Sequence, residues 1–120
     1  MNNISETKRT PSVTFDNNSI TIKGKSIPEH AVDFYNPIKT DIIEFVSSKK
    51  SVELNFQFIY FNTSSYKSIL EIIKKSQELS DELTINWYYE PEDEDMQDSG
   101  QDIKELLSTV NVNIIEQVIE

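Results

Sequence analysis

Four small polar residues, Asn-Thr-Ser-Ser at positions 62–65, are the first candidates for chemistry in this chain of 120 residues. They follow an apolar run at 51–61 and precede a periodic apolar run at 66–79. Asn, Thr and Ser are favoured helix N-caps because their side-chain oxygens accept backbone N–H groups that lack a partner in the first turn. The same N–H groups and the positive end of the helix dipole also favour an anion. The residue types therefore fit two roles, an ordinary helix cap or a hydroxyl that carries a phosphate.

A strand and a helix are predicted to hold this junction in place. The strand alternates with a period of two, and its apolar members are Val52, Leu54, Phe56, Phe58 and Tyr60. Ile59 and Phe61 make the second face apolar near its end, as expected where layers cover both faces of a sheet. The helix shows its period through Tyr66, Ile69, Leu70 and Ile73. We therefore expect strand 52–60 to be central in its sheet, with the junction between strand and helix.

The second candidate is the acidic segment 90–102. Seven of its thirteen residues are acidic: Glu90, Glu92, Asp93, Glu94, Asp95, Asp98 and Asp102. Carboxylates bind Mg²⁺ or Ca²⁺, but the segment lacks the EF-hand arrangement of acids around a glycine with a final glutamate. Nothing places two acids across a cleft, as glycosidase chemistry requires. Three interpretations stay open. The segment is a solvated helix start, an acidic structural or interaction surface in a protein that is not switched by phosphorylation, or the site of a small Mg²⁺-dependent enzyme.

The composition excludes several classes of protein. A net charge of −10 argues against binding to nucleic acid or to an anionic membrane. The absence of cysteine excludes disulfides, thiol catalysis and Cys-ligated zinc. The single histidine, His30, has no nucleophile or metal-ligand pattern beside it and receives no role. No apolar run reaches membrane-spanning length and the polar start lacks a signal-peptide core, so we expect a cytoplasmic protein without a cofactor.

The rest of the chain supplies short strands and two further helices. Runs 12–15 and 19–23 predict an opening β-hairpin around the turn 16–18, with Gly24 breaking the second strand. Asn36 and Pro37 predict the cap and first residue of a helix, after a separate turn or short helix at 28–35. Segment 83–89 predicts a strand, the residues from Met96 to Leu107 a helix, and 110–114 a last strand.

The resulting order, β-β-α-β-α-β-α-β, predicts an α/β fold. Strands that alternate with helices form parallel pairs, so the sheet should be mixed and mostly parallel, with the N-terminal hairpin as its antiparallel part. The length suits one core, so we expect a single domain at 11–120 after a flexible N-terminus at 1–10.

Three blocks of the chain together resemble a known family: SIPEHAVDFYNPI at 26–38, FIYFNTSSYKSILEI at 58–72 and INWYYEPEDEDMQDSGQDI at 85–103. With the hairpin and the last strand they cover nearly the whole chain, in the right order. The chain resembles the SiaC-type regulatory phosphoproteins, whose fold is similar to that of anti-sigma-factor antagonists (STAS domains). At His30 it departs from the family pattern, with PEH in place of PEN. That position lies outside the block that carries the junction.

The resemblance implies a non-enzymatic signalling protein. Family members are phosphorylated on a hydroxyl of the NTSS junction by a dedicated kinase, and a metal-dependent phosphatase reverses this. The unmodified form binds and activates a diguanylate cyclase, in cyclic-di-GMP signalling. Carried to this chain, the acceptor is Thr63, with Ser64 or Ser65 as alternatives after a shift of register. The unmodified hydroxyl is expected to cap the helix. The residues implied to lie near the partner are Phe61, Asn62, Ser65 and Tyr66.

Overall fold

The computed structural model describes residues 2–120, which form five strands and three helices. Their bounds are β1 (Ser12–Phe15), β2 (Ser19–Ser26), α1 (Ala31–Ser47), β3 (Ser51–Phe61), α2 (Thr63–Leu79), β4 (Glu82–Tyr89), α3 (Glu94–Leu106) and β5 (Asn111–Glu116). The predicted order and the α/β fold class are confirmed.

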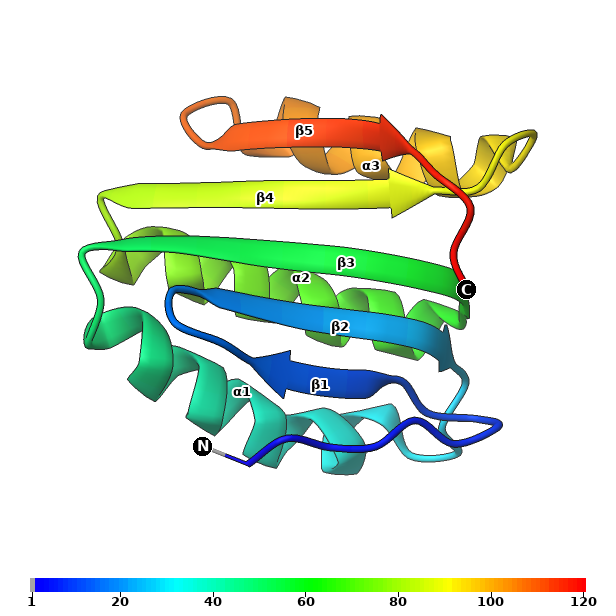
Figure 1. Cartoon of the computed structure of the whole chain (residues 1–120), viewed down its shortest axis with the longest axis horizontal. Helices are drawn as coiled ribbons and strands as arrows, with labels where there is room; N and C mark the ends of the chain where they lie inside the picture. The colour runs from blue at the N-terminus through cyan, green and yellow to red at the C-terminus, as the bar shows by residue number, and fades with distance from the viewer. Residues whose placement is uncertain (1) are drawn as a thin grey trace.

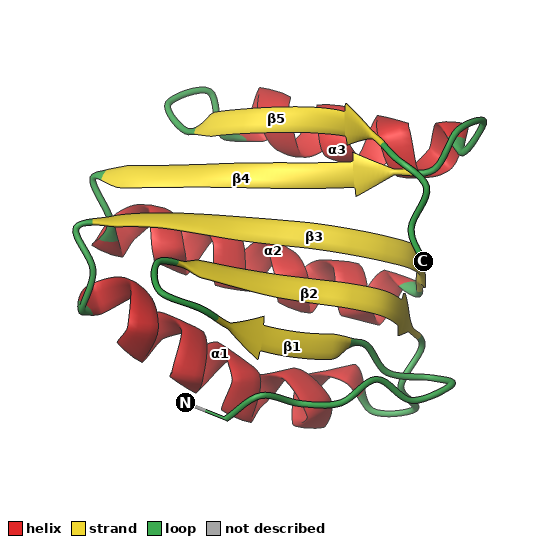
Figure 2. Cartoon of the chain, in the orientation of Figure 1, coloured by secondary structure: helices red, strands yellow, loops and turns green. Residues whose placement is uncertain are grey.

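The strands form one sheet in the order β1-β2-β3-β4-β5, with β3 in the middle as predicted. β1 and β2 pair antiparallel and the three later pairs are parallel, so the mixed sheet with an N-terminal hairpin is confirmed. Each parallel strand is added on the same side of the previous one. Right-handed crossovers in a constant direction place every connecting helix on the same face. Figures 1 and 2 show α1, α2 and α3 together behind the sheet.

The opposite face of the sheet is open and carries a polar ladder. Thr21, Asn55, Asn86 and Asn113 lie side by side on four successive strands. Asn86 Nδ2 donates to Asn55 Oδ1 at 2.8 Å, and Asn113 Nδ2 donates to Asn86 Oδ1 at 3.0 Å. The expectation that layers cover both faces at β3 is therefore wrong. The period of two in this strand separates a helix-covered apolar face from an open polar face.

A β-bulge near the end of β3 changes which side chains face the helices. Gly24 of β2 pairs with Phe58, but the next pair along the ladder involves Tyr60, so Ile59 is an extra residue. An extra residue turns the side chains that follow it to the opposite face. Tyr60 is accordingly 57% exposed, although the alternation placed it with the apolar face. Phe61 instead packs against the core, which corrects the interpretation of a second apolar face.

Gly24 does not break the second strand, contrary to prediction. β2 continues to Ser26, with its register shift between Gly24 and Lys25. The φ of Gly24 is +119°, a backbone conformation open to glycine but rarely adopted by other residues. The glycine therefore accommodates the bulge and lets the strand continue beyond it.

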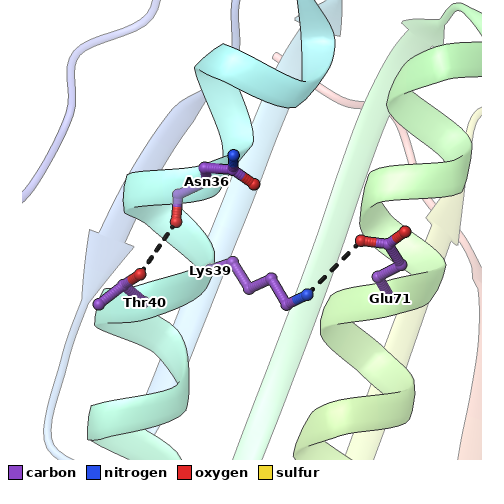
Figure 3. Close-up of polar contacts among 4 residues, drawn as sticks. All are labelled: Asn36, Lys39, Thr40 and Glu71. Atoms are coloured by element: carbon purple, nitrogen blue, oxygen red, sulfur yellow. Dashed lines mark hydrogen bonds and ion pairs between the residues drawn. The ribbon is translucent and has the colours of Figure 1, made fainter.

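The first helix begins earlier than Asn36 and Pro37 predict. α1 starts at Ala31, with Pro37 inside it. Figure 3 shows Asn36 within the helix, where its backbone carbonyl accepts a hydrogen bond from Thr40 Oγ1 at 3.2 Å. Pro37 lacks the N–H that would bond the carbonyl of Asp33, but both residues are exposed and water can reach that carbonyl.

Burial of an apolar stripe explains why α1 extends through the proline. The stripe consists of Ala31, Tyr35, Ile38, Ile42, Phe45 and Val46, all of them buried. Its first two members precede Pro37 at helical spacing, so burying them against the sheet outweighs the lost hydrogen bond. On the outer surface, Lys39 Nζ lies 3.5 Å from Glu71 Oε2 and links α1 to α2 (Figure 3).

The N-terminal segment lies along β1. Ile4 and Val13 exchange two backbone hydrogen bonds of 2.8 and 2.9 Å, and Ile27 N donates to the carbonyl of Arg9 at 2.8 Å. The expected flexibility of 1–10 stays a prediction, and Met1 lies outside the described residues. None of the helices within 2–120 is long and apolar enough to cross a membrane.

Candidate functional site

The NTSS junction lies where β3 ends and α2 begins, at the edge where the carboxyl ends of the parallel strands gather (Figure 1). Asn62 is the N-cap, and its Oδ1 accepts a hydrogen bond from Ser65 N at 2.9 Å. Its own N–H donates to the Ser26 carbonyl at 3.0 Å. The predicted cap is confirmed, but the capping group is this amide. The expectation that a hydroxyl caps the helix is wrong, because Asn62 already supplies the oxygen.

Thr63 and Ser64 are the first two residues of α2, and both are exposed. Neither hydroxyl makes a hydrogen bond within the described part of the chain. Their backbone N–H groups are among the first four of the helix, which have no intrahelical acceptor. The two hydroxyls therefore stand in solvent beside the positive end of the helix dipole.

Ser65 differs from its two neighbours because it is completely buried. Its Oγ lies 2.8 Å from Ser26 Oγ and 3.0 Å from the Ser26 carbonyl oxygen. Ser26 Oγ in turn lies 2.5 Å from the hydroxyl of Tyr35, and both residues are buried. Burial raises the pKa of Tyr35 to about 12, although hydrogen bonding with Ser26 and Ser65 opposes this. The three hydroxyls form a buried network beneath the junction, which we call the hydroxyl network.

Sequence reasoning missed Ser26 and Tyr35 as parts of the site. A helix extended back from Ile38 would have placed Tyr35 on the buried stripe, since 35, 38 and 42 share helical spacing. No comparable signal marks Ser26, because the second strand was predicted to end before it, at Lys23.

Two aromatic rings flank the junction. Phe61 and Tyr66 stack with ring centroids 5.3 Å apart, and Phe61 also meets Trp87 at 6.1 Å. Both flanking residues are half-buried and pack against the core. Burial raises the pKa of Tyr66, with a smaller contribution from Asp102. The predicted neighbours Phe61, Asn62 and Tyr66 therefore lie around Thr63 and Ser64 as one surface.

The acidic segment begins α3 and does not gather its carboxylates at one point. Asp93 is the N-cap, with its Oδ1 accepting a hydrogen bond from Met96 N at 3.1 Å. Among residues 2–120, no three Asp, Glu or His side chains are placed to hold a metal ion. A pocket of about 150 Å³ separates this helix start from the end of β3. It is lined by Ile59, Tyr60, Phe61, Asp93, Asp95, Met96 and Ser99.

Comparisons with known proteins agree with this fold. A curated relative, an uncharacterized protein of Pseudomonas aeruginosa (strain UCBPP-PA14), is 22% identical over 105 residues, covering 82% of this chain and 83% of the relative. SiaC in the crystal structure of the diguanylate cyclase SiaD with its activator SiaC, from Pseudomonas aeruginosa, matches with a TM-score of 0.86 at 20% identity. A second structure, of SiaC of Pseudomonas aeruginosa, matches with a TM-score of 0.81 at 21% identity. Both structural matches cover 98% of this chain and all of the other.

The family match covers almost the whole chain. A model of the family described as SiaC family regulatory phosphoprotein matches residues 4–117. The match includes the NTSS junction, the hydroxyl network and the start of α3. The chain therefore belongs to the SiaC family.

Proposed function

We propose that this protein is a non-enzymatic signalling protein whose binding to a partner is switched by reversible phosphorylation at Thr63. The observation that carries the proposal is the pair of exposed hydroxyls on the first turn of α2, in a chain of a phosphoprotein family. A kinase must reach its acceptor, and Thr63 and Ser64 are reachable as they stand. Thr63 is the acceptor we propose, with Ser64 as its alternative.

Ser65 is the third candidate hydroxyl, and its surroundings disfavour it. The side chain is buried and its oxygen is engaged with Ser26 twice. Phosphorylation there would require the hydroxyl to leave the network and the first turn of α2 to open. Ser65 therefore contributes to the partner-binding surface from beneath, by supporting Asn62 and Thr63.

The switch would act by blocking the partner, without refolding the domain. A phosphate on Thr63 adds about 1.5 to 2 negative charges beside free N–H groups and the positive helix end, which stabilise it in place. A partner that covers Phe61, Asn62 and Tyr66 would then have to desolvate this dianion. Such burial is strongly unfavourable unless a cation pairs with the phosphate.

The partner we propose is a diguanylate cyclase. SiaC of Pseudomonas aeruginosa is an activator found in complex with the diguanylate cyclase SiaD, and this chain shares its fold. A dedicated protein kinase would add the phosphate and a metal-dependent phosphatase would remove it, all in the cytoplasm. This chain itself needs no cofactor for that role.

Intact-mass measurement tests the switch directly. Protein purified from its own host should lose one phosphate mass on phosphatase treatment, and fragmentation should place that phosphate on Thr63. Thr63→Ala should stay folded, resist phosphorylation and keep binding the cyclase. Thr63→Asp should weaken binding by roughly tenfold, about 1.4 kcal/mol, because its carboxylate must be desolvated.

Thr14, an exposed residue of β1, gives the matched controls. Thr14→Ala and Thr14→Asp should leave both modification and binding unchanged. A phosphate on Ser64 would move the acceptor by one residue and keep the mechanism. If no hydroxyl from Thr63 to Ser65 is modified in the host, the proposal is wrong.

The enzyme alternative makes a different prediction. Because Asp93 caps α3 and the carboxylates do not converge, calorimetry with Mg²⁺ or Ca²⁺ should show no stoichiometric site. Micromolar binding that disappears in Asp93→Asn/Asp95→Asn would support a metal-dependent activity of segment 90–102. Asp98→Asn, an exposed acid on the same helix, is the control for charge alone.

A further inference from the structure

We infer that Tyr35 and Ser26 are positioning residues that decide which hydroxyls of the NTSS junction are presented for modification. The inference rests on the proposed function, because it concerns the same acceptor loop. It assigns a role to two residues outside that loop, one on β2 and one on α1.

The hydrogen-bond directions in the hydroxyl network follow from counting protons. Ser65 Oγ donates to the Ser26 carbonyl at 3.0 Å, because a carbonyl can only accept. Ser26 Oγ must then donate to Ser65 Oγ at 2.8 Å, since the Ser65 proton is already used. With the Ser26 proton also used, Tyr35 must be the donor in its 2.5 Å contact with Ser26 Oγ. One directed chain therefore runs from Tyr35 through Ser26 to Ser65 and ends on the backbone of Ser26.

Ser26 holds the loop at two points. Its carbonyl accepts from both the Asn62 N–H and the Ser65 hydroxyl, at 3.0 Å each. Asn62 in turn accepts from Ser65 N, so the cap and the buried serine are held together. Thr63 and Ser64 lie between these two anchored residues, and their side chains are exposed to solvent.

Tyr35, on α1, holds Ser26 in this hydrogen-bonded arrangement. It is 2% exposed, and its hydroxyl makes a hydrogen bond with Ser26 Oγ. Like any tyrosine it is protonated, and hence a donor, in the neutral range, and burial raises its pKa further. Without that donor, Ser26 Oγ is free to rotate and release Ser65, which then competes with Thr63 and Ser64 as an accessible hydroxyl.

Hydrogen exchange of the unmodified protein tests the inference without any kinase. In Tyr35→Phe, the amides of Asn62 and Ser65 should exchange roughly fivefold faster, the effect of losing one hydrogen bond. Core amides such as those of Phe56 and Trp87 should change much less. Tyr60→Phe, at an exposed tyrosine, is the matched control and should change neither group. Equal changes at the loop and in the core would overturn the inference.

A double variant separates positioning from general stability. Ser26→Ala alone leaves the Tyr35 hydroxyl buried without an acceptor, which should lower the midpoint of denaturant unfolding. Ser26→Ala/Tyr35→Phe removes both partners, so the midpoint should recover while fast exchange at Asn62 and Ser65 persists. If the unfolding midpoint and the exchange rates of Asn62 and Ser65 both return to their wild-type values, the two residues have a purely structural role and the inference is contradicted.

Phosphosite mapping completes the test. Wild-type and double-variant proteins are incubated with ATP and a lysate of the chain's own host, and the phosphorylated positions are mapped by mass spectrometry. The double variant should acquire phosphate on Ser65 that wild type lacks. Modification confined to Thr63 and Ser64 in both proteins would overturn the inference. If wild type is modified nowhere in the loop, the proposed function fails, while the exchange experiment still decides the positioning role.

Discussion

Tyr35 is a residue whose environment makes stability depend on pH. Burial raises its pKa to about 12, against about 10 for an unfolded chain. The folded state therefore favours the protonated form. The corresponding stabilisation is complete below about pH 10 and is lost as the pH rises through the folded pKa.

The expected loss between about pH 10 and pH 12 is about 2 to 3 kcal/mol, from two pKa units at Tyr35. Denaturant titrations at a series of alkaline pH values should show it in wild type. In Tyr35→Phe that part of the slope should be missing, with the remainder due to other groups such as Tyr66. Parallel curves for the two proteins would mean that Tyr35 titrates normally.

Trp87 and Gly100 set how closely α3 approaches the sheet. Trp87 is completely buried, and its Nε1–H donates to the Met96 carbonyl at 2.9 Å. A Cβ added at Gly100 would lie only 2.4 Å from Trp87 Cδ1. The glycine is therefore required by a close approach of helix to ring.

Gly100→Ala should destabilise the protein in spite of the better helix propensity of alanine. The propensity gain is about 1 kcal/mol, whereas overpacking in a core costs about 1 to 3 kcal/mol. The second effect should win, because a buried indole held by a hydrogen bond has no room to move. The free energy of unfolding should fall in a denaturant titration, while Gln101→Ala, exposed on the same helix, should stay within about 0.5 kcal/mol of wild type. An increase in stability for Gly100→Ala would show that α3 can shift.

At the scale of the element, β3 supplies both the centre of the core and the approach to the site. Its four buried side chains, Val52, Leu54, Phe56 and Phe58, face the helices. The bulge at Ile59 then moves Phe61 to that same face, where it meets Tyr66 of α2. The bulge thus joins the core to the aromatic surface beside the NTSS junction.

Phe56→Ala should cost about 3 to 5 kcal/mol, as truncation of a buried aromatic side chain usually does. Phe56 is 1% exposed and its ring lies 5.5 Å from that of Trp87. Tyr60→Ala, on the exposed side of the same strand, is the control and should cost far less. A loss below about 1 kcal/mol for Phe56→Ala, measured by denaturant titration, would contradict the central position of its side chain.

At the scale of the whole molecule, one core connects all the elements. The radius of gyration is 13.2 Å, close to the roughly 14 Å expected for a compact domain of this length. Buried residues from all five strands and all three helices belong to one hydrophobic cluster. The helices lie together on one face of the sheet (Figure 2). We therefore propose that residues 11–120 fold as one domain.

Unfolding should accordingly be a single cooperative transition. Trp87, the only tryptophan, lies in the core and reports tertiary packing by fluorescence, while far-ultraviolet circular dichroism reports helices and strands. The two transitions should coincide in denaturant. Separate midpoints would mean that part of the sheet unfolds independently and that the chain has more than one folding unit.

Local patterns in the amino-acid sequence are sufficient to predict the individual elements. Alternation in β3, the helical stripe of α2 and the polar junction between them predicted the central strand, the helix and the place of the site, because side-chain period follows directly from backbone geometry. The acidic start of α3 was visible from composition alone. These features depend on neighbours in the sequence.

Contacts between distant segments depend on how the elements pack in three dimensions. The crossovers put three helices on one face, the Gly24 register shift turned Phe61 toward the core, and burial of Tyr35 carried α1 through Pro37. The same packing brought Ser26 and Tyr35 beneath Ser65, from three different elements. Strand register and crossover handedness control these contacts, and neither is written in the period of any one segment.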